Sequence, residues 1–359
     1  MLQTLVNALK TPELRKKILY TAFIILIFRI GAAISVPFTN AAQGIIDDTT
    51  SAGNFMNYLN MMTGDAFNYS TLFAMSITPY INASIIMQLL GVAIPALERL
   101  SKEGDVGRKK LQRITRVVAV VIAALQSTAY FFYLRSGGYL STDANGLAFT
   151  GFSAVLQALV VIITLIAGSA IMMWLGEQIN AKGIGNGISL LIFAGIVSNL
   201  FNGIVGGFRT AGTVTAFIGA FAILALLVIL TAVVTFIDLG ERRIPLQIAK
   251  QVKGRRVYGG QNTHMTLKVI SVGVMPLIFA YSFLSFPGTI AQLVDPSASG
   301  WFTKFCNNHL VNGAWGHLIL SALLIFAFTF FYSSISFDAK KQAEQLQQQG
   351  ATIPGRRGK

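Results

Sequence analysis

The sequence predicts an all-α membrane protein, a polytopic helical bundle of eight spans. Of its 359 residues, 53% are hydrophobic and only 12% are charged, which is too apolar for a soluble globular protein. Long charge-free runs recur, and several reach the roughly 20 residues that a helix needs to cross a bilayer. No segments alternate polar and apolar residues as the strands of a membrane β-barrel do.

The eight predicted spans are separated by polar or charged connections. Judged by their length, they lie near residues 18–37, 73–96, 116–134, 153–175, 187–207, 214–237, 268–292 and 315–337. The charged residues outside them indicate an orientation. The net charge is +14, from 28 Lys and Arg against 14 Asp and Glu, and 24 of those 28 fall on one side. Because basic residues concentrate on the cytoplasmic side, we expect both termini there.

The N-terminal segment and the first span carry two features of interest. Residues 1–17 place several apolar side chains on one helical face, which indicates a helix on the cytoplasmic surface, although a solvated tail explains the segment equally well. Arg29 lies within the first span, where a charge is costly. A helix-packing partner is its commoner explanation. The first span has no small-residue cleavage site, so we expect it to stay in the membrane.

The segment before Glu98 has 32 residues without a charge. This exceeds one crossing, so part of it must fold back before the second span begins. Ile77 and Ile81 are four residues apart, with Pro79 between them, and share one helical face. Branched aliphatic side chains can form a hydrophobic constriction in a pore. From these residues alone, an ordinary packing or lipid-facing stripe remains the alternative.

Two connections are informative. Gly183, Gly185 and Gly187 predict a tight turn between two membrane helices, since the strand and acidic residue of a dinucleotide site are missing. Residues 240–268 are strongly basic and predict a hairpin or helix pair outside the membrane, which would bind anionic lipid or an acidic or RNA-bearing partner. The tail, residues 338–359, predicts a water-soluble helix broken at Gly350 and Pro354.

Enzymatic chemistry is not expected. The chain has three histidines and one cysteine, Cys306, and no Walker loop, nucleophile elbow or paired intramembrane carboxylates. We therefore expect no catalytic residues, no cofactor and no metal site. A polytopic solute transporter is the alternative function. Three polar residues within the spans, Asn82, Gln88 and Gln126, are neutral and favour a channel or a helix interface over an ion-coupled site.

Six stretches of the chain form a recognisable series: FRIG, SITPYINASIIMQLL, KEGDVGRKKLQRITR, WLGEQINAKGIGNGISLLIFAGIVSNL, ERRIPLQIAKQVKGRRVYGGQNTHMTLKV and AEQLQQQGATIPG. In order and spacing they resemble the SecY family, the pore subunit of the bacterial Sec protein-conducting channel. The resemblance implies ten spans in two inverted halves. Residues 1–207 would be the N-terminal half and residues 208–359 an incomplete C-terminal half, because the sequence ends at Lys359 before spans nine and ten.

The resemblance also implies roles for individual residues. A short helix over residues 55–70 would be a plug. A pore ring would comprise Ile77, Ile81, Ile192 and Ile278, and gate-facing residues would be Asn82, Gln88, Gln126 and Phe286. Residues docking a cytosolic partner would be Arg242, Arg243, Arg255, Arg256 and Arg357. The tail reads IPGRRGK, which departs from the family pattern around Arg357.

The implied function is the central pore of the Sec translocase. It would pass unfolded secretory proteins across the bacterial cytoplasmic membrane and release membrane helices sideways into lipid. The implied partners are SecE, SecG, the SecA motor, the ribosome, signal sequences, nascent polypeptides and lipid. Basic clusters suit the acidic or phosphate-rich surfaces of the motor and the ribosome, without recognition of a nucleic-acid sequence.

Overall fold

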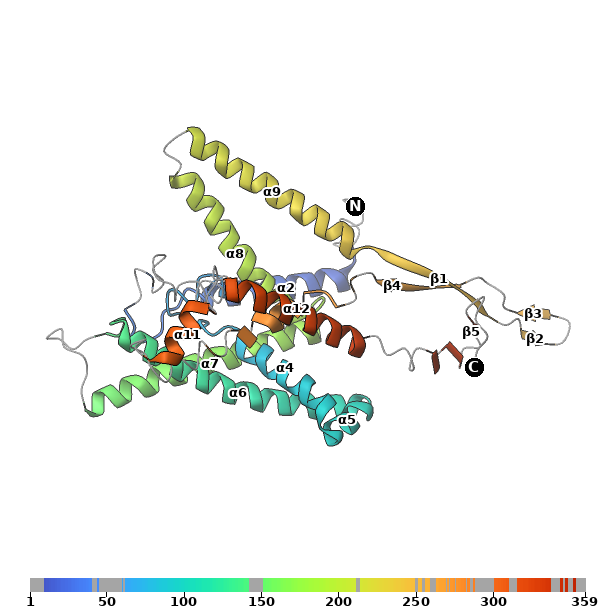
Figure 1. Ribbon diagram of the computed structural model, residues 1–359, viewed down its shortest axis with the longest axis horizontal. Coiled ribbons are helices and arrows are strands. Elements are labelled where there is room, and N and C mark those ends of the chain that lie inside the picture. Colours follow the sequence, from blue (N-terminus) through green and yellow to red (C-terminus); the bar gives the residue numbers. More distant parts are fainter. Residues whose placement is uncertain are drawn as a thin grey trace. The chain divides into compact units, whose positions relative to one another are not determined.

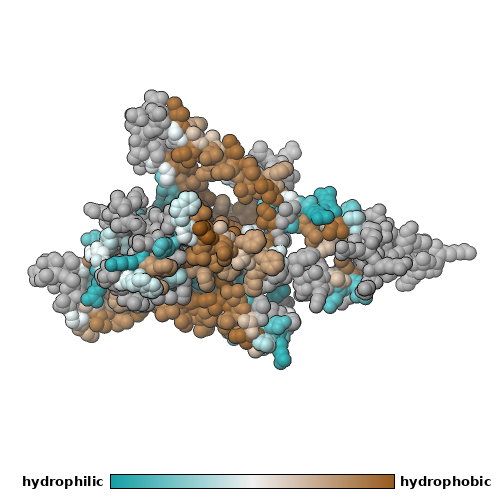
Figure 2. All heavy atoms as spheres, in the orientation of Figure 1, coloured by the Kyte–Doolittle hydropathy of each residue, from teal (hydrophilic) through white to brown (hydrophobic). Residues whose placement is uncertain are grey.

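A computed structural model shows a chain built mainly of helices (Figure 1). Five helices contain stretches long and apolar enough to cross a membrane, among the residues that the structure describes: α6 (Asp105–Ser136), α7 (Phe152–Lys182), α8 (Gly187–Thr210), α9 (Val214–Asp238) and α12 (Trp315–Ser336). Apolar residues cover much of the described helices, with hydrophilic residues among the strands (Figure 2). The described residues are 10–40, 44, 60, 62–141, 151–210, 214–248, 251–253, 256–258, 263–268, 270, 272–274, 276–281, 283, 284, 287, 300–309, 315–336, 343, 344, 346, 347, 351 and 352.

The chain forms two compact units. Unit 1 comprises Met1–Val205 and Ser282–Leu318, and unit 2 comprises Gly206–Tyr281 and Ile319–Lys359. The division into halves at residues 207 and 208 stays a prediction. Unit 1 contains the elements that position the candidate site: α2 (Pro12–Gly31), α4 (Thr78–Ala93), α5 (Pro95–Lys102), α6 (Asp105–Ser136), α7 (Phe152–Lys182), most of α8 (Gly187–Thr210) and α11 (Trp301–His309).

In the structure, the helix of the first predicted span is shifted toward the N-terminus, and the helix of the second is shorter than predicted. Helix α2 ends at Gly31 instead of residue 37, because the chain then turns and pairs with the segment before α4: the Val36 amide donates to the Ser70 carbonyl at 2.9 Å. Helix α4 begins at Thr78, not residue 73, with a proline in its first turn. It ends at Ala93 because Pro95 favours an extended Ile94.

The connection between the second and third predicted spans is largely helical. Helix α5 follows α4 directly, and α6 begins at Asp105, well before the span predicted at 116–134. The sequence there, GRKKLQRITR, is rich in Lys, Arg, Leu and Gln, which favour helix, so the spanning helix extends outward. Residues 1–9, predicted as part of a surface helix, lie outside the described residues.

The core of unit 1 joins α6 and α7 to the segment before α4. Its largest cluster of buried side chains comprises Val36, Phe67, Ala74, Met75, Tyr130, Phe131, Leu134, Val161 and Leu165. Leu134, Val161 and Leu165 have no exposed surface. Two helices and a non-helical segment therefore share one packed interior.

Unit 2 carries the strands. After α9 (Val214–Asp238), β1 (Glu241–Ile248) pairs antiparallel with β4 (Thr263–Lys268), and β2 (Gln251–Lys253) pairs with β3 (Arg256–Tyr258). The basic segment thus forms hairpin structure, not a helix pair. In the tail, residues 343, 344, 346 and 347 are helical, and β5 (Ala351–Thr352) pairs with the end of β1. Helix α12 (Trp315–Ser336) begins in unit 1 and continues into unit 2.

Candidate functional site

The candidate site is a buried, mostly non-helical segment, residues 62–77, that leads into α4. Met62 and Thr63 are helical, but turns occupy residues 64–70, so the short helix predicted over 55–70 ends at Thr63. It ends there because Gly64 and Asp65 adopt left-handed φ of 66° and 71°. Residues 55–59 and 61 lie outside the described residues. Non-helical backbone at membrane depth is tolerated where protein or a water-filled cavity surrounds it.

The beginning of this segment is held on α8 by amide groups. The Asp65 carboxylate accepts hydrogen bonds from Nδ2 of Asn199 at 3.3 Å and from Nδ2 of Asn202 at 3.2 Å. Asn199 Nδ2 also lies 3.3 Å from the Asn60 carbonyl, and Asn60 Nδ2 donates to Asp65 at 2.8 Å. Three side-chain amides therefore converge on this one carboxylate.

Close backbone contact accompanies these hydrogen bonds. Gly64 faces Gly195 of α8, and a Cβ added at Gly195 would lie 2.5 Å from the carbonyl oxygen of Met62. That distance is too short for a side chain, so only glycine at this position lets the segment reach α8.

Arg29 of α2 also reaches the segment. Its Nη1 donates to the Gly64 carbonyl at 3.1 Å. The partner expected for this arginine is therefore a backbone carbonyl in the segment. An oriented guanidinium in an otherwise apolar span gives that carbonyl a strong donor.

The end of the segment, residues 66–76, is anchored differently. The Tyr130 hydroxyl on α6 donates to the Phe67 carbonyl at 2.7 Å, and it lies 2.7 Å from Ser70 Oγ. Because a tyrosine hydroxyl has one hydrogen, Ser70 is the donor in the second contact. On α7, Ser169 Oγ donates to the Ser76 carbonyl at 3.2 Å. These contacts satisfy backbone groups that no helix pairs.

The predicted pore-ring residues lie on different elements. Ile77 and Ile81, at the start of α4, are buried, with 2% and 7% of their surface exposed. Ile77 packs beside Gly176 of α7. Ile192 is half-buried on α8. Ile278 belongs to unit 2 and is buried beside Phe279, whose ring contacts two aromatic residues of α12. The ring itself stays a prediction.

The predicted gate residues differ in exposure. Asn82 is buried on α4, and its Oδ1 has no hydrogen-bond partner, a feature it shares with Ser127 Oγ on α6 among the described residues. Gln126 is half-buried on α6 and Gln88 is exposed on α4. Phe286 lies outside the described residues. A buried amide oxygen without a hydrogen-bond donor costs free energy. A new donor would therefore lower the free energy most at Asn82 among these residues.

The glycine-rich turn predicted between the fourth and fifth spans is confirmed. Helix α7 ends at Lys182 and α8 begins at Gly187. The Gly187 amide donates to Asn180 Oδ1 at 2.7 Å, and a Cβ at Gly187 would lie 2.1 Å from the Gly176 carbonyl oxygen. The turn therefore needs glycine for close packing, not for a phosphate.

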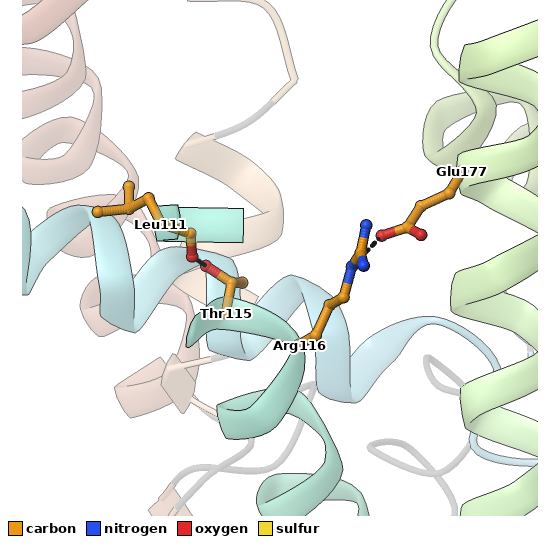
Figure 3. A network of polar contacts seen from close by, with 4 residues as sticks. All are labelled: Leu111, Thr115, Arg116 and Glu177. Carbon is orange, nitrogen blue, oxygen red and sulfur yellow. Dashed lines mark hydrogen bonds and ion pairs between the residues drawn. The ribbon is translucent and has the colours of Figure 1, made fainter. Parts of the chain in front are cut away.

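An ion pair joins α6 to α7 (Figure 3). Arg116 Nε donates to Glu177 Oε1 at 2.6 Å, and the side chains are 44% and 28% exposed. Thr115, one residue earlier, donates back to the Leu111 carbonyl of its own helix at 2.9 Å. Since Gly176 is the neighbour of Ile77, the pair ties α6 to the part of α7 on which α4 begins.

Reversing one charge of this ion pair is expected to destabilise unit 1, and reversing both to restore it. Arg116→Glu alone places two carboxylates together, whereas Arg116→Glu with Glu177→Arg reforms the pair. Because the side chains are partly exposed, we expect a coupling of about 0.2–1 kcal/mol in a double-mutant cycle of thermal unfolding. The same cycle on Lys110 and Glu103, 4.0 Å apart and more exposed, is the control and should give less. Equal coupling in the two cycles would contradict the expectation.

Three of the predicted docking residues lie on strands. Arg242 and Arg243 are in β1, opposite Leu267 and Thr266 of β4, and both are exposed. Arg256 begins β3, opposite Lys253 of β2. Arg255 and Arg357 lie outside the described residues. The tail and the basic segment, predicted as separate docking regions, meet where β5 pairs with β1.

Sequence reasoning missed the residues that hold the buried segment on α8. Asn199 and Asn202 are three residues apart in an apolar span, so they share one helical face. Two amides on one face of a membrane helix indicate a polar partner, and this signal could have located the contact with Asp65.

These features define a class: a multi-pass helical membrane protein with a non-helical segment packed among its helices. A SecY family profile matches residues 71–359. The chain belongs to the SecY family.

Two curated relatives, each named protein translocase subunit SecY, extend over nearly the whole chain. The relative from Streptomyces scabiei is 39% identical, covering 99% of this chain and 82% of its own length. The relative from Mycobacterium tuberculosis strain H37Rv is 37% identical, covering 99% of this chain and 81% of its own length.

Solved structures share the fold. A chain described as the structure of a protein conducting channel has a TM-score of 0.68 at 19% identity, covering 96% of this chain and 78% of that one. Sec61 in the canine ribosome-channel complex from the endoplasmic reticulum has a TM-score of 0.55 at 22% identity, covering 78% and 59%. At these identities the likeness concerns the fold alone.

Proposed function

We propose that this chain is the pore-forming subunit of a Sec translocase, which passes unfolded secretory proteins across a membrane and releases membrane helices sideways into lipid. The observation that carries this is the buried segment at residues 62–77, in a chain of the SecY family. A compact bundle of lipid-facing helices has no need of such a segment, whereas a channel needs something to close it. The solute-transporter alternative has no support from the matched relatives or structures.

Within this function, residues 55–70 act as the plug, and Ile77, Ile81, Ile192 and Ile278 form the constriction. The burial of Ile77 at the end of the segment and of Ile81 in the first turn of α4 supports both roles. Asn82, Gln88, Gln126 and Phe286 face the lateral gate. The unpaired Oδ1 of Asn82 supports its part in this, because a passing signal sequence or helix could supply the missing donor.

The proposed setting is the bacterial cytoplasmic membrane, with both termini in the cytoplasm. The positive-inside distribution of basic residues supports this orientation. The proposed partners are SecE, SecG, the SecA motor, the ribosome, signal sequences and nascent polypeptides. Sec61 in a ribosome-channel complex and a yeast Ssh1 complex bound to the 80S ribosome, both similar in fold, support the ribosome as a partner.

Reconstitution tests the function directly. Proteoliposomes that contain this chain with SecE and SecG are expected to import a secretory precursor when SecA and ATP are supplied, and only when the precursor has its signal sequence. The measurement is the amount of precursor protected from added protease. Equal import of a precursor without a signal sequence, or no import at all, would contradict the proposal.

Reversing charge in the basic hairpin region is expected to weaken docking. Arg255→Glu with Arg256→Glu reverses two charges of the proposed docking surface for an acidic or phosphate-rich partner, and we expect at least about a tenfold loss of affinity for SecA or ribosomes. The control is Lys109→Glu with Arg113→Glu, the same change of charge on exposed residues of α6. Equal losses of affinity in the two variants would show a general effect of charge. Unchanged binding would mean that the hairpin serves only to set membrane topology or to contact lipid.

A further inference from the structure

The segment 62–77 is attached to unit 1 in two chemically different ways. We call its beginning, Asn60 with residues 62–65, the arm, and residues 66–76 the foot. Polar groups hold the arm: the Asn199 and Asn202 amides on α8, and the Arg29 guanidinium on α2. Met62 is the one apolar side chain among the arm's described residues, and it is buried together with the polar Asn60 and Thr63.

The foot is embedded in the apolar core. Phe67, Phe73 and Met75 are between 2% and 7% exposed, and Phe67 and Met75 belong to the main buried cluster. The ring of Phe67 lies 4.6 Å from that of Tyr130, which also bonds the foot's backbone. The Leu72 amide donates to the Ile34 carbonyl at 2.8 Å. Displacing the foot would expose two phenylalanines and break these bonds together.

The two attachments differ in what release would cost. Hydrogen bonds of the arm can be exchanged for hydrogen bonds to water, so their net loss is modest. The foot would lose apolar burial, which water does not replace. The arm is therefore the part that can leave while the fold stays intact.

The backbone between them suits a hinge. Gly64 and Asp65 are consecutive residues in the left-handed region. Glycine changes φ at little steric cost, and aspartate is among the residues that best tolerate positive φ. A rotation about these two residues would redirect the arm without moving Ala66, which is 1% exposed.

We propose that Asp65 and the α8 amides of Asn199 and Asn202 form a releasable clasp, and that the plug opens at Gly64–Asp65 while the foot remains in the channel wall. This rests on the plug role proposed above. It assigns Asp65, Asn199 and Asn202 as positioning residues of the closed state and places the boundary between the moving arm and the fixed foot at Gly64–Asp65.

Hydrogen exchange of backbone amides tests the clasp in the resting protein, reconstituted with its partners in nanodiscs. Asp65→Asn removes the charge and one acceptor while keeping a residue that tolerates positive φ. The amides of Asp65, Phe67 and Asn68 have acceptors on the arm: the Asn60 carbonyl, Thr63 Oγ1 and Asn60 Oδ1. We expect these amides to exchange at least about tenfold faster, and the Thr71 and Leu72 amides of the foot to be unchanged.

Exchanging the two groups gives the matched control. Asn199→Asp alone opposes two carboxylates and should accelerate exchange more than Asp65→Asn. Combined with Asp65→Asn it places an amide opposite a carboxylate again and should slow exchange to within about threefold of the parent. Asn202→Ala leaves the sequence of the segment unaltered. It should accelerate exchange at the same amides as Asp65→Asn, but by a smaller factor.

Two outcomes would overturn the inference. Uniform acceleration over residues 65–72 would show that arm and foot open as one unit. Unchanged exchange in Asp65→Asn would show that the α8 amides do not hold the arm. Exchange is measured at rest, so either result is independent of protein import. A failed import assay with the expected exchange pattern would instead reject the proposed function.

Discussion

Replacing Gly195 by alanine is expected to give a channel that leaks ions at rest. The added methyl group would lie 2.5 Å from the Met62 carbonyl oxygen, so the segment before Asp65 must move away from α8. Such a shift lengthens the hydrogen bonds from Asn199 and Asn202, which are already 3.2–3.3 Å long. We expect resting conductance in planar bilayers to rise at least about tenfold, because hydrogen bonds weaken steeply as their geometry departs from the ideal.

Gly203→Ala is the matched control for this change. Gly203 lies on the same helix, and a Cβ there would meet no atom within 4 Å. It makes the same chemical change and raises helix propensity equally, so it should leave resting conductance at the parent level. A leak of equal size in both variants would show that glycine is needed in α8 for another reason. A tight seal in Gly195→Ala would show that the contact between the segment and α8 is not needed to close the channel.

Replacing Gly168 by alanine is expected to destabilise the fold of unit 1 itself. A Cβ at Gly168 on α7 would lie 1.9 Å from the carbonyl oxygen of Leu72 in the foot. Because that oxygen belongs to backbone in a packed interior, relief requires α7 and the segment to separate. Overpacking of this kind costs about 1–3 kcal/mol of folding stability. Replacing glycine by alanine in a helix gains about 1 kcal/mol, so the overpacking dominates when its cost is in the upper part of that range.

The measurement is the apparent Tm of the purified protein in detergent, followed by tryptophan fluorescence or by aggregation. Gly91→Ala on α4 is the control, since a Cβ there meets no atom within 4 Å, and its Tm should be unchanged or higher. A Tm for Gly168→Ala equal to that of Gly91→Ala would mean that the foot is less firmly packed against α7 than the structure indicates.

Helix positions were largely predictable, because charge-free runs of membrane length have few structural solutions. The spans predicted at 153–175, 187–207, 214–237 and 315–337 each lie within or nearly within a helix. The boundaries of the first two spans were not predictable from hydropathy. Residues 32–37 and 73–77 are apolar enough to span, yet they form turns. The backbone of residues 34–36 pairs with Ser70 and Leu72, and the Ser76 carbonyl accepts a hydrogen bond from Ser169 of α7.

The candidate site was predictable only in part. Apolar pattern and family resemblance located Ile77 and Ile81, and the excess length of the charge-free run showed that something must fold back before α4. Hydropathy also marked Arg29 as needing a partner. It could not identify that partner, because the partner is a backbone carbonyl, a group that every residue has.

By itself, the sequence determined that this chain is a multi-pass helical membrane protein. The length of the apolar runs and the positions of the charges predict this whatever the packing of the helices. Only the tertiary structure decided how residues 62–77 are held. Asp65 meets Asn199 and Asn202 across more than 130 positions of chain, and Gly64 meets Gly195 through backbone alone. Such contacts depend on where the helices cross. The hydrophobic pattern does not determine the crossing points, because lipid and protein are equally apolar surroundings for a span.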